Sequence, residues 1–121
     1  MKKEERLLKH VTSICLALAG VTQEVRPSHA TFRVGKKVFV YFLNGDHSDG
    51  ILSVCCKAFA GDNQALVAAE PKRFYLPDYI GAKGWVGLRL DVGKVDWEEV
   101  QQLVLGSYKL TAPKKLVKPL S

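Results

Sequence analysis

The sequence predicts a two-layer α+β fold, in which an antiparallel sheet of about five strands carries the first and last helices on one face. Three observations lead to this fold class. Residues 84–91 alternate apolar and polar side chains with a period of two, which is typical of a strand. Helical periodicity is found near both ends of the chain. Between them, short apolar runs are separated by turn formers, which gives the expected order α-β-β-β-α-β-β-α.

The length and composition predict a single domain over residues 1–121, because a chain of 121 residues can bury an ordinary core. The apolar content of 47% and the charged content of 25% are typical of globular proteins. No run approaches the roughly 20 apolar residues of a membrane span, so no membrane partner is expected. The chain start lacks the apolar stretch of a signal peptide, and the three cysteines occupy unrelated positions. The expected location is therefore the cytoplasm.

The first half of the chain reads as one helix and three strands. Residues 3–19 place apolar side chains at helical spacing, and Gly20 is well placed to end this helix. Pro27 marks an irregular or edge entry into the sheet. Three strands are then expected, separated by the Gly35-Lys36 turn and by a polar loop, at residues 31–34, 37–43 and 51–58.

The second half begins with a short helix at residues 60–69, which Pro71 ends. A short strand at 74–77 and a loop at 78–83 lead into the alternating strand at 84–91. One face of that strand carries apolar side chains only, and the other is mixed. The apolar face consists of Val86, Leu88 and Leu90, and the mixed face of Trp85, Gly87, Arg89 and Asp91.

The last helix has a clear start signal. Asp96 is a good N-cap and Glu99 stands three residues later, as a capping box requires. An apolar stripe then runs from Trp97 to Tyr108. Since both tryptophans of the chain lie on this strand and helix, we expect the two elements to pack together at the centre of the core.

This region also carries a family resemblance. It lies in GWVGLRLD at residues 84–91, WEEV at 97–100 and SYKLTAPKKL at 107–116, with weaker support from GKKVF at 35–39 and LAGV at 18–21. The chain resembles the MmcQ/YjbR family of small bacterial proteins, which are described as predicted DNA-binding proteins with a double-wing motif. One departure is Ala19, where the family often has Pro before Gly. The resemblance implies an α/β fold like that of secretion chaperones, and it implies no established active site.

No candidate catalytic or metal site is complete. Cys55 and Cys56 are adjacent on a strand and point to opposite faces, and Cys15 lies in the apolar stripe of the first helix. All three are expected to be packed as small hydrophobes. His10 and His29 have no motif around them and are expected at the surface. We therefore predict no metal, no cofactor and no enzymatic activity.

The loop at residues 44–50 is the most polar cluster, and it has three interpretations. As a calcium loop it has its glycine at the seventh position, and Cys55 stands where a bidentate glutamate is needed. As an acid–base pair it would use His47 with Asp46 or Asp49. A solvated hairpin loop explains every residue without either, because Asn, Gly, Asp and Ser are turn formers.

The basic residues indicate an anionic partner, given a net charge of +6. They group at the first hairpin turn, around the later strand pair and in the C-terminal segment, which holds Lys109, Lys114, Lys115 and Lys118 and no acid. The first interpretation is weak, sequence-nonspecific DNA binding by phosphate neutralisation. The candidate contacts are Arg33, Lys36, Lys37, Lys72, Arg73, Lys83, Arg89, Lys114 and Lys115.

Two other interpretations of the charge stay open. The lysines are equally explained as the solvated surface of a mildly basic protein. The alternative function is a protein-interaction module, since the fold resembled is that of chaperones that bind another polypeptide. An exposed apolar sheet face or a groove lined by Phe39, Tyr41 or Leu43 would mark it. The sequence leaves the oligomeric state open.

Overall fold

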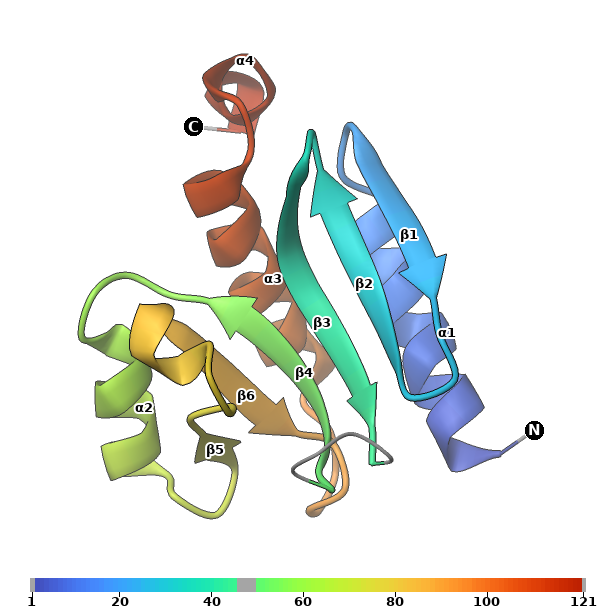
Figure 1. The fold of residues 1–121 in the computed structure, drawn as a ribbon, viewed down its shortest axis with the longest axis vertical. Coiled ribbons are helices and arrows are strands. Elements are labelled where there is room, and N and C mark those ends of the chain that lie inside the picture. Colours follow the sequence, from blue (N-terminus) through green and yellow to red (C-terminus); the bar gives the residue numbers. More distant parts are fainter. Residues whose placement is uncertain (1, 46–49, 121) are drawn as a thin grey trace.

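The computed structural model describes residues 2–45 and 50–120. Its centre is a six-stranded antiparallel sheet in the order β1-β2-β3-β4-β6-β5. In Figure 1 the long helices α1 and α3 lie behind this sheet, and α2 lies beside β5 and β6. The elements are α1 (Lys3–Leu16), β1 (Val21–Val25), β2 (His29–Val34), β3 (Lys37–Asn44), β4 (Leu52–Lys57), α2 (Asp62–Ala69), β5 (Phe74–Tyr75), η1 (Gly81–Lys83), β6 (Trp85–Arg89), α3 (Trp97–Thr111), α4 (Lys114–Val117) and η2 (Lys118–Leu120).

The predicted α+β class, with the first and last long helices on one face, is confirmed. The strand count is not, because the sheet has a sixth strand, β1, at an edge where an irregular entry was expected. The first helix ends at Leu16, three residues early, and a turn leads from it into β1. Gly20 lies in that turn with a φ of 77°, a left-handed conformation that glycine adopts at little cost.

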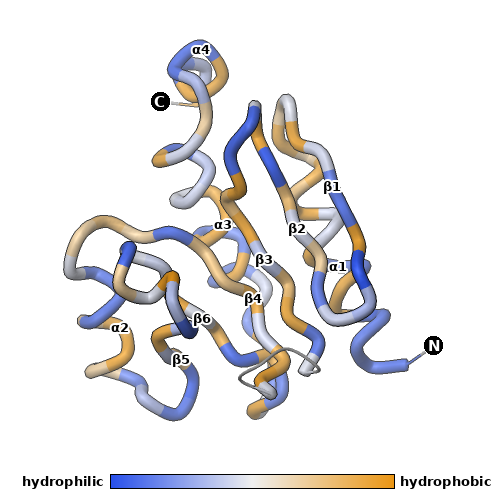
Figure 2. Tube along the Cα trace, viewed as in Figure 1, coloured by the Kyte–Doolittle hydropathy of each residue, from blue (hydrophilic) through white to orange (hydrophobic). Residues whose placement is uncertain are grey.

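The main core lies between the sheet and the helices. Figure 2 shows the apolar residues concentrated on the central strands, while the tip of the β2–β3 hairpin and the start of α1 are hydrophilic. Helix α1 contributes Leu7, Val11 and Cys15 to the same buried cluster to which α3 contributes Val100, Val104 and Tyr108. Sheet residues of this cluster include Phe32, Phe39, Phe42, Val54, Val86 and Leu88.

The opposite face of the sheet carries a second, smaller cluster of Leu43, Cys55 and Trp85. The ring of Tyr41 packs against that of Trp85, with 5.2 Å between centroids. Beside it, the ring of Tyr75 lies so close to Gly87 that a Cβ there would come within 2.3 Å of it. The alternation predicted for β6 is therefore confirmed, since Trp85 lies on the opposite face from the helix-side core.

The Trp85 strand and the last helix belong to one core, as expected, through residues such as Val86 and Val104, but the strand is not the main contact of the helix. Helix α3 packs mainly on β3 and β4, and β6 is the next strand beyond β4. The two tryptophans consequently have different neighbours. Trp97 stacks on His10 of α1, with 3.6 Å between ring centroids and 19° between planes.

A β-bulge shapes the hairpin next to α3. Phe32 pairs with Val40 and Arg33 with Val38, so Phe39 is the extra residue of β3. Its carbonyl oxygen accepts a hydrogen bond of 2.6 Å from the hydroxyl of Ser107, which is fully buried. The same hydroxyl accepts one of 3.0 Å from the backbone N–H of Lys57, at the end of β4. Ser107 thus joins β3 and β4 where their own pairing has ended.

The neighbouring Tyr108 fixes the other side of the helix. Its hydroxyl donates to the carbonyl oxygen of Ala19 at 2.7 Å, and its ring meets Phe39 edge to face. Burial raises the pKa of Tyr108. The Ser-Tyr pair that carries part of the family resemblance therefore has a structural role here, because it attaches α3 to the bulge and to the turn after α1.

Candidate nucleic-acid interface

The structure brings the β2–β3 hairpin turn and the C-terminal segment together. A Cβ at Gly35 would lie 3.8 Å from Cγ of Pro113, so the turn touches the start of α4. A cavity of about 380 Å³ between them is lined by Lys36, Lys37 and Lys114, among others. Figure 1 shows this junction at the upper end of the molecule.

A second cavity, of about 390 Å³, lies between the end of α3 and α4. Ala112 and Val117 form its apolar part, and the rest of its lining is lysine. Among the described residues, no acidic side chain lines either cavity. We call the exposed lysines of the two cavities the lysine cap, which consists of Lys36, Lys37, Lys109, Lys114, Lys115 and Lys118.

The C-terminal end of α3 adds to the electrostatics of the lysine cap. The partial negative charge of a helix C-terminus stabilises Lys109 in the last turn. Thr111 lines the cavity at the hairpin, and its buried Oγ1 has no hydrogen-bond partner among the described residues. The cap therefore consists of exposed cations beside the negative end of a helix dipole.

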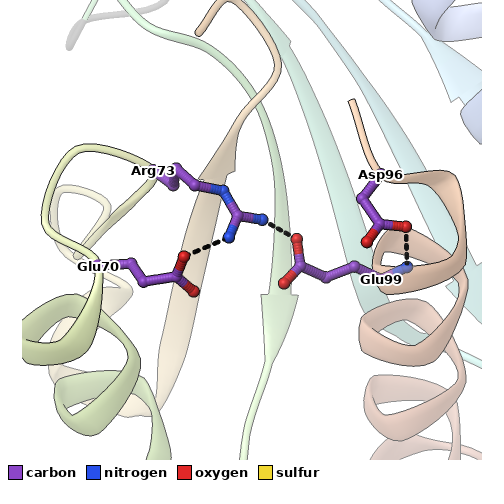
Figure 3. A network of polar contacts seen from close by, with 4 residues as sticks. All are labelled: Glu70, Arg73, Asp96 and Glu99. Atoms are coloured by element: carbon purple, nitrogen blue, oxygen red, sulfur yellow. Dashed lines mark hydrogen bonds and ion pairs between the residues drawn. The ribbon is translucent and has the colours of Figure 1, made fainter. Parts of the chain in front are cut away.

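Arg73, a predicted DNA contact, lies far from the cap and binds carboxylates. Its guanidinium donates to Glu70 and to Glu99, as Figure 3 shows, and lies over the ring of Phe74. The hydrogen bond to Glu70 is the largest cause of the raised pKa of Arg73, and Glu99 adds to it. Figure 3 also shows Asp96 capping α3, where its Oδ1 accepts from the N–H of Glu99 at 3.2 Å. The predicted N-cap is confirmed, but the Glu99 side chain binds Arg73.

Arg89 is engaged in a similar way. Its Nε and one terminal nitrogen donate to the two carboxylate oxygens of Asp91 at 3.0 and 3.1 Å. This bidentate pair raises the pKa of Arg89 and lowers that of Asp91. At Arg73 and at Arg89 a phosphate would have to displace a carboxylate, so neither guanidinium group is available for a bidentate phosphate contact.

The remaining predicted contacts also lie outside the cap. Arg33 is half-buried on β2, where it pairs with Thr22 and Val38. Lys72, before β5, and Lys83, in η1, are exposed, and neither lines a cap cavity. The structure thus unites four of the nine predicted residues, Lys36, Lys37, Lys114 and Lys115, and adds Lys109 and Lys118 to them.

The other candidate chemistry can be placed only in part. Asp46, His47 and Asp49 lie outside the described residues, so the calcium and acid–base interpretations of their loop stay untested. Within residues 2–45 and 50–120, no group of three or more His, Cys, Asp or Glu side chains is arranged to hold a metal ion. The three cysteines are buried and form no disulfide among the described residues, and burial raises the pKa of Cys15 to about 12.

A sequence model of the YjbR family matches residues 16–110. The chain belongs to the YjbR family. A crystal structure of the Deinococcus radiodurans protein DR2400, which carries a DUF419 domain, superposes with a TM-score of 0.72 and 23% identity, covering 93% of this chain and 86% of that one. At that identity the likeness shows a shared fold. No curated protein is similar enough in sequence to count as a match. Among the described residues of this YjbR protein, no helix has the length and apolar character to cross a membrane.

Proposed function

We propose that this YjbR protein binds DNA weakly and without sequence preference, through the phosphate backbone and the lysine cap. One observation carries the proposal: the hairpin turn and the C-terminal segment, far apart in the sequence, meet around cavities whose described lining has lysines and no acid. Exposed lysines neutralise phosphates without reading bases.

The proposal includes no base readout and no catalysis. The first turn of α3 is acidic, with Glu98 and Glu99, and would repel phosphate, so α3 does not serve as a recognition helix. The protein acts without a metal or cofactor. Binding therefore depends on counterion release, and its affinity falls steeply with salt.

The test is a titration of labelled duplex and single-stranded DNA at low and physiological salt. The variant K36E/K37E changes two cap lysines, and K72E/K83E makes the same charge change outside the cap. We expect K36E/K37E to weaken binding to any sequence equally and to reduce the salt slope by about 1 for each lost phosphate contact. K72E/K83E should lose much less affinity for DNA.

Three results would contradict the proposal. If neither DNA binds at low salt, or if K36E/K37E binds as well as wild type, the lysine cap is not a DNA interface. Equal losses in the two variants would indicate a net-charge effect with no defined site. The protein-interaction module would then be preferred, although the groove expected for it is not formed by Phe39, which is buried in the helix-side core, or by Leu43, which is also buried.

A further inference from the structure

A second cationic cavity lies at the opposite end of the molecule from the lysine cap. Helices α1 and α3 both begin at the lower end in Figure 1, and both run toward the cap. Between the start of α1 and the loop before α3 lies a cavity of about 480 Å³. It is lined by Lys3, Arg6, Leu7, His10, Lys94, Val95 and Trp97.

The charge in this cavity is positive. Lys3 and Arg6 are exposed one turn apart on α1, and Lys94 approaches from the loop after β6. No acidic side chain lines the cavity among the described residues. The hydrogen bonds from Arg89 are the main cause of the lowered pKa of Asp91, and Lys3 contributes least, so this carboxylate is near Lys3 but is held by Arg89.

These cations lie where the helices disfavour them. Lys3 is the first residue of α1, and Lys94 precedes the N-cap of α3, so both are near the positive ends of helix dipoles. Glu4 and Glu5 offset part of this charge in the first turn of α1, but they line a different cavity. A bound anion would relieve the repulsion, because it would face two helix starts and three cations.

The cavity also has an apolar wall. Leu7 is buried, and Val95 and Trp97 are half-buried. The imidazole of His10 stacks on the indole of Trp97, so two aromatic rings, one behind the other, belong to the lining. Pockets for small molecules typically have about 300–1,000 Å³ and combine apolar walls with a few polar groups. A cavity of about 480 Å³ has room for more than a bare phosphate ion.

We propose that this cavity binds a phosphate-bearing small molecule. The phosphate is held by Lys3, Arg6 and Lys94, and the organic part rests on Trp97 and His10. Charge-assisted hydrogen bonds from Lys and Arg supply the affinity, and the apolar wall favours a phosphate monoester over free phosphate. This site does not depend on DNA binding at the lysine cap.

The indole N–H signals of the two tryptophans report on the site in proton–nitrogen NMR spectra. Trp97 lines the cavity, and Trp85, on the other face of the sheet, is an internal control. The probes are adenosine 5′-monophosphate, inorganic phosphate and adenosine. We expect the monophosphate to shift the Trp97 signal alone and to bind more tightly than inorganic phosphate. Adenosine at the same concentration should leave the signal in place.

Two variants with the same charge change complete the test. K3Q/R6Q/K94Q should bind the monophosphate at least about tenfold more weakly. The loss of even one fully formed hydrogen bond to a charged group raises Kd by more than about tenfold. K36Q/K37Q/K114Q, at the lysine cap, should bind it as wild type does. If the lysine cap also binds DNA, K36Q/K37Q/K114Q will lose affinity for DNA and K3Q/R6Q/K94Q will keep it.

The proposal is overturned if about 10 mM monophosphate, tenfold above a millimolar Kd, leaves the Trp97 signal unchanged. It is also overturned if adenosine binds equally well, or if both variants lose affinity alike. Equal affinity for inorganic phosphate and the monophosphate would refute the role given to the aromatic wall. Circular dichroism of each variant will show whether it is folded, and an unfolded K3Q/R6Q/K94Q is replaced by the single changes K3Q and K94Q.

Discussion

Replacing Ser107 with alanine should destabilise the protein by about 2–4 kcal/mol. The hydroxyl makes two hydrogen bonds, to the carbonyl oxygen of Phe39 at 2.6 Å and from the N–H of Lys57 at 3.0 Å. A buried carbonyl left without a partner costs about 1–3 kcal/mol. The lost bond at Lys57 adds about 1 kcal/mol, since this residue is exposed at its side chain and water can partly replace the bond.

Urea denaturation followed by circular dichroism measures this loss, and the melting temperature should fall by about 3–5 °C for each kcal/mol. Hydrogen exchange at the Lys57 amide gives a local readout, because its protection in S107A should drop more than that of central strand amides. Ser13 is exposed on α1, so S13A is a matched control that should gain a few tenths of a kcal/mol from helix propensity. If S107A unfolds within about 0.5 kcal/mol of wild type, the reasoning is refuted.

Two further predictions concern the sheet and the core. G87A should lower the free energy of unfolding by about 1–3 kcal/mol, because its Cβ would fall within 2.3 Å of the Tyr75 ring. Urea denaturation should show a smaller loss when the same change is made in a Y75L background. Equal losses in the two backgrounds would rule out this contact as the cause. The folded pKa of Cys15 is raised from 9.0 to about 12, so above pH 9 the unfolded thiol ionises while the folded one does not. Stability should therefore fall between about pH 9 and 12, by up to about 1.4 kcal/mol per pH unit, and C15V should flatten this slope in denaturation measured at several pH values; an unchanged slope would contradict the assignment.

Local signals in the sequence were sufficient for much of the fold. The period of two placed Trp85 and Val86 on opposite faces, and the structure separates them into two clusters. The sequence also predicted Asp96 as the N-cap of α3 correctly, because capping depends on residues only three positions apart. The edge strand β1 was missed because it is short and Pro27 follows it closely.

The candidate sites depend on contacts that no local pattern contains. The meeting of the Gly35 turn with Pro113 requires the path of α3 across β3 and β4, and the Ser107 bonds require the bulge at Phe39. The engagement of Arg89 could have been predicted, since the alternation already put Asp91 on the same face of the strand. The stacking of His10 on Trp97 had no such signal, because the two rings come from opposite ends of the chain.

The order of strands in the sheet has a consequence for how the chain folds. Strands β1 to β4 form a meander in which each strand pairs with the one before it, so these contacts close short loops and can form early. The contacts of helix α3 with β3 and β4 instead join distant parts of the sequence, and the hydrogen bond between Ser107 and Phe39 spans 68 residues. We expect the docking of α3 to follow the transition state. The hydrogen bond from Ser107 to the bulge at Phe39 would then form late in folding. Its removal would speed unfolding, and so shorten the lifetime of the native state, while leaving the folding rate almost unchanged.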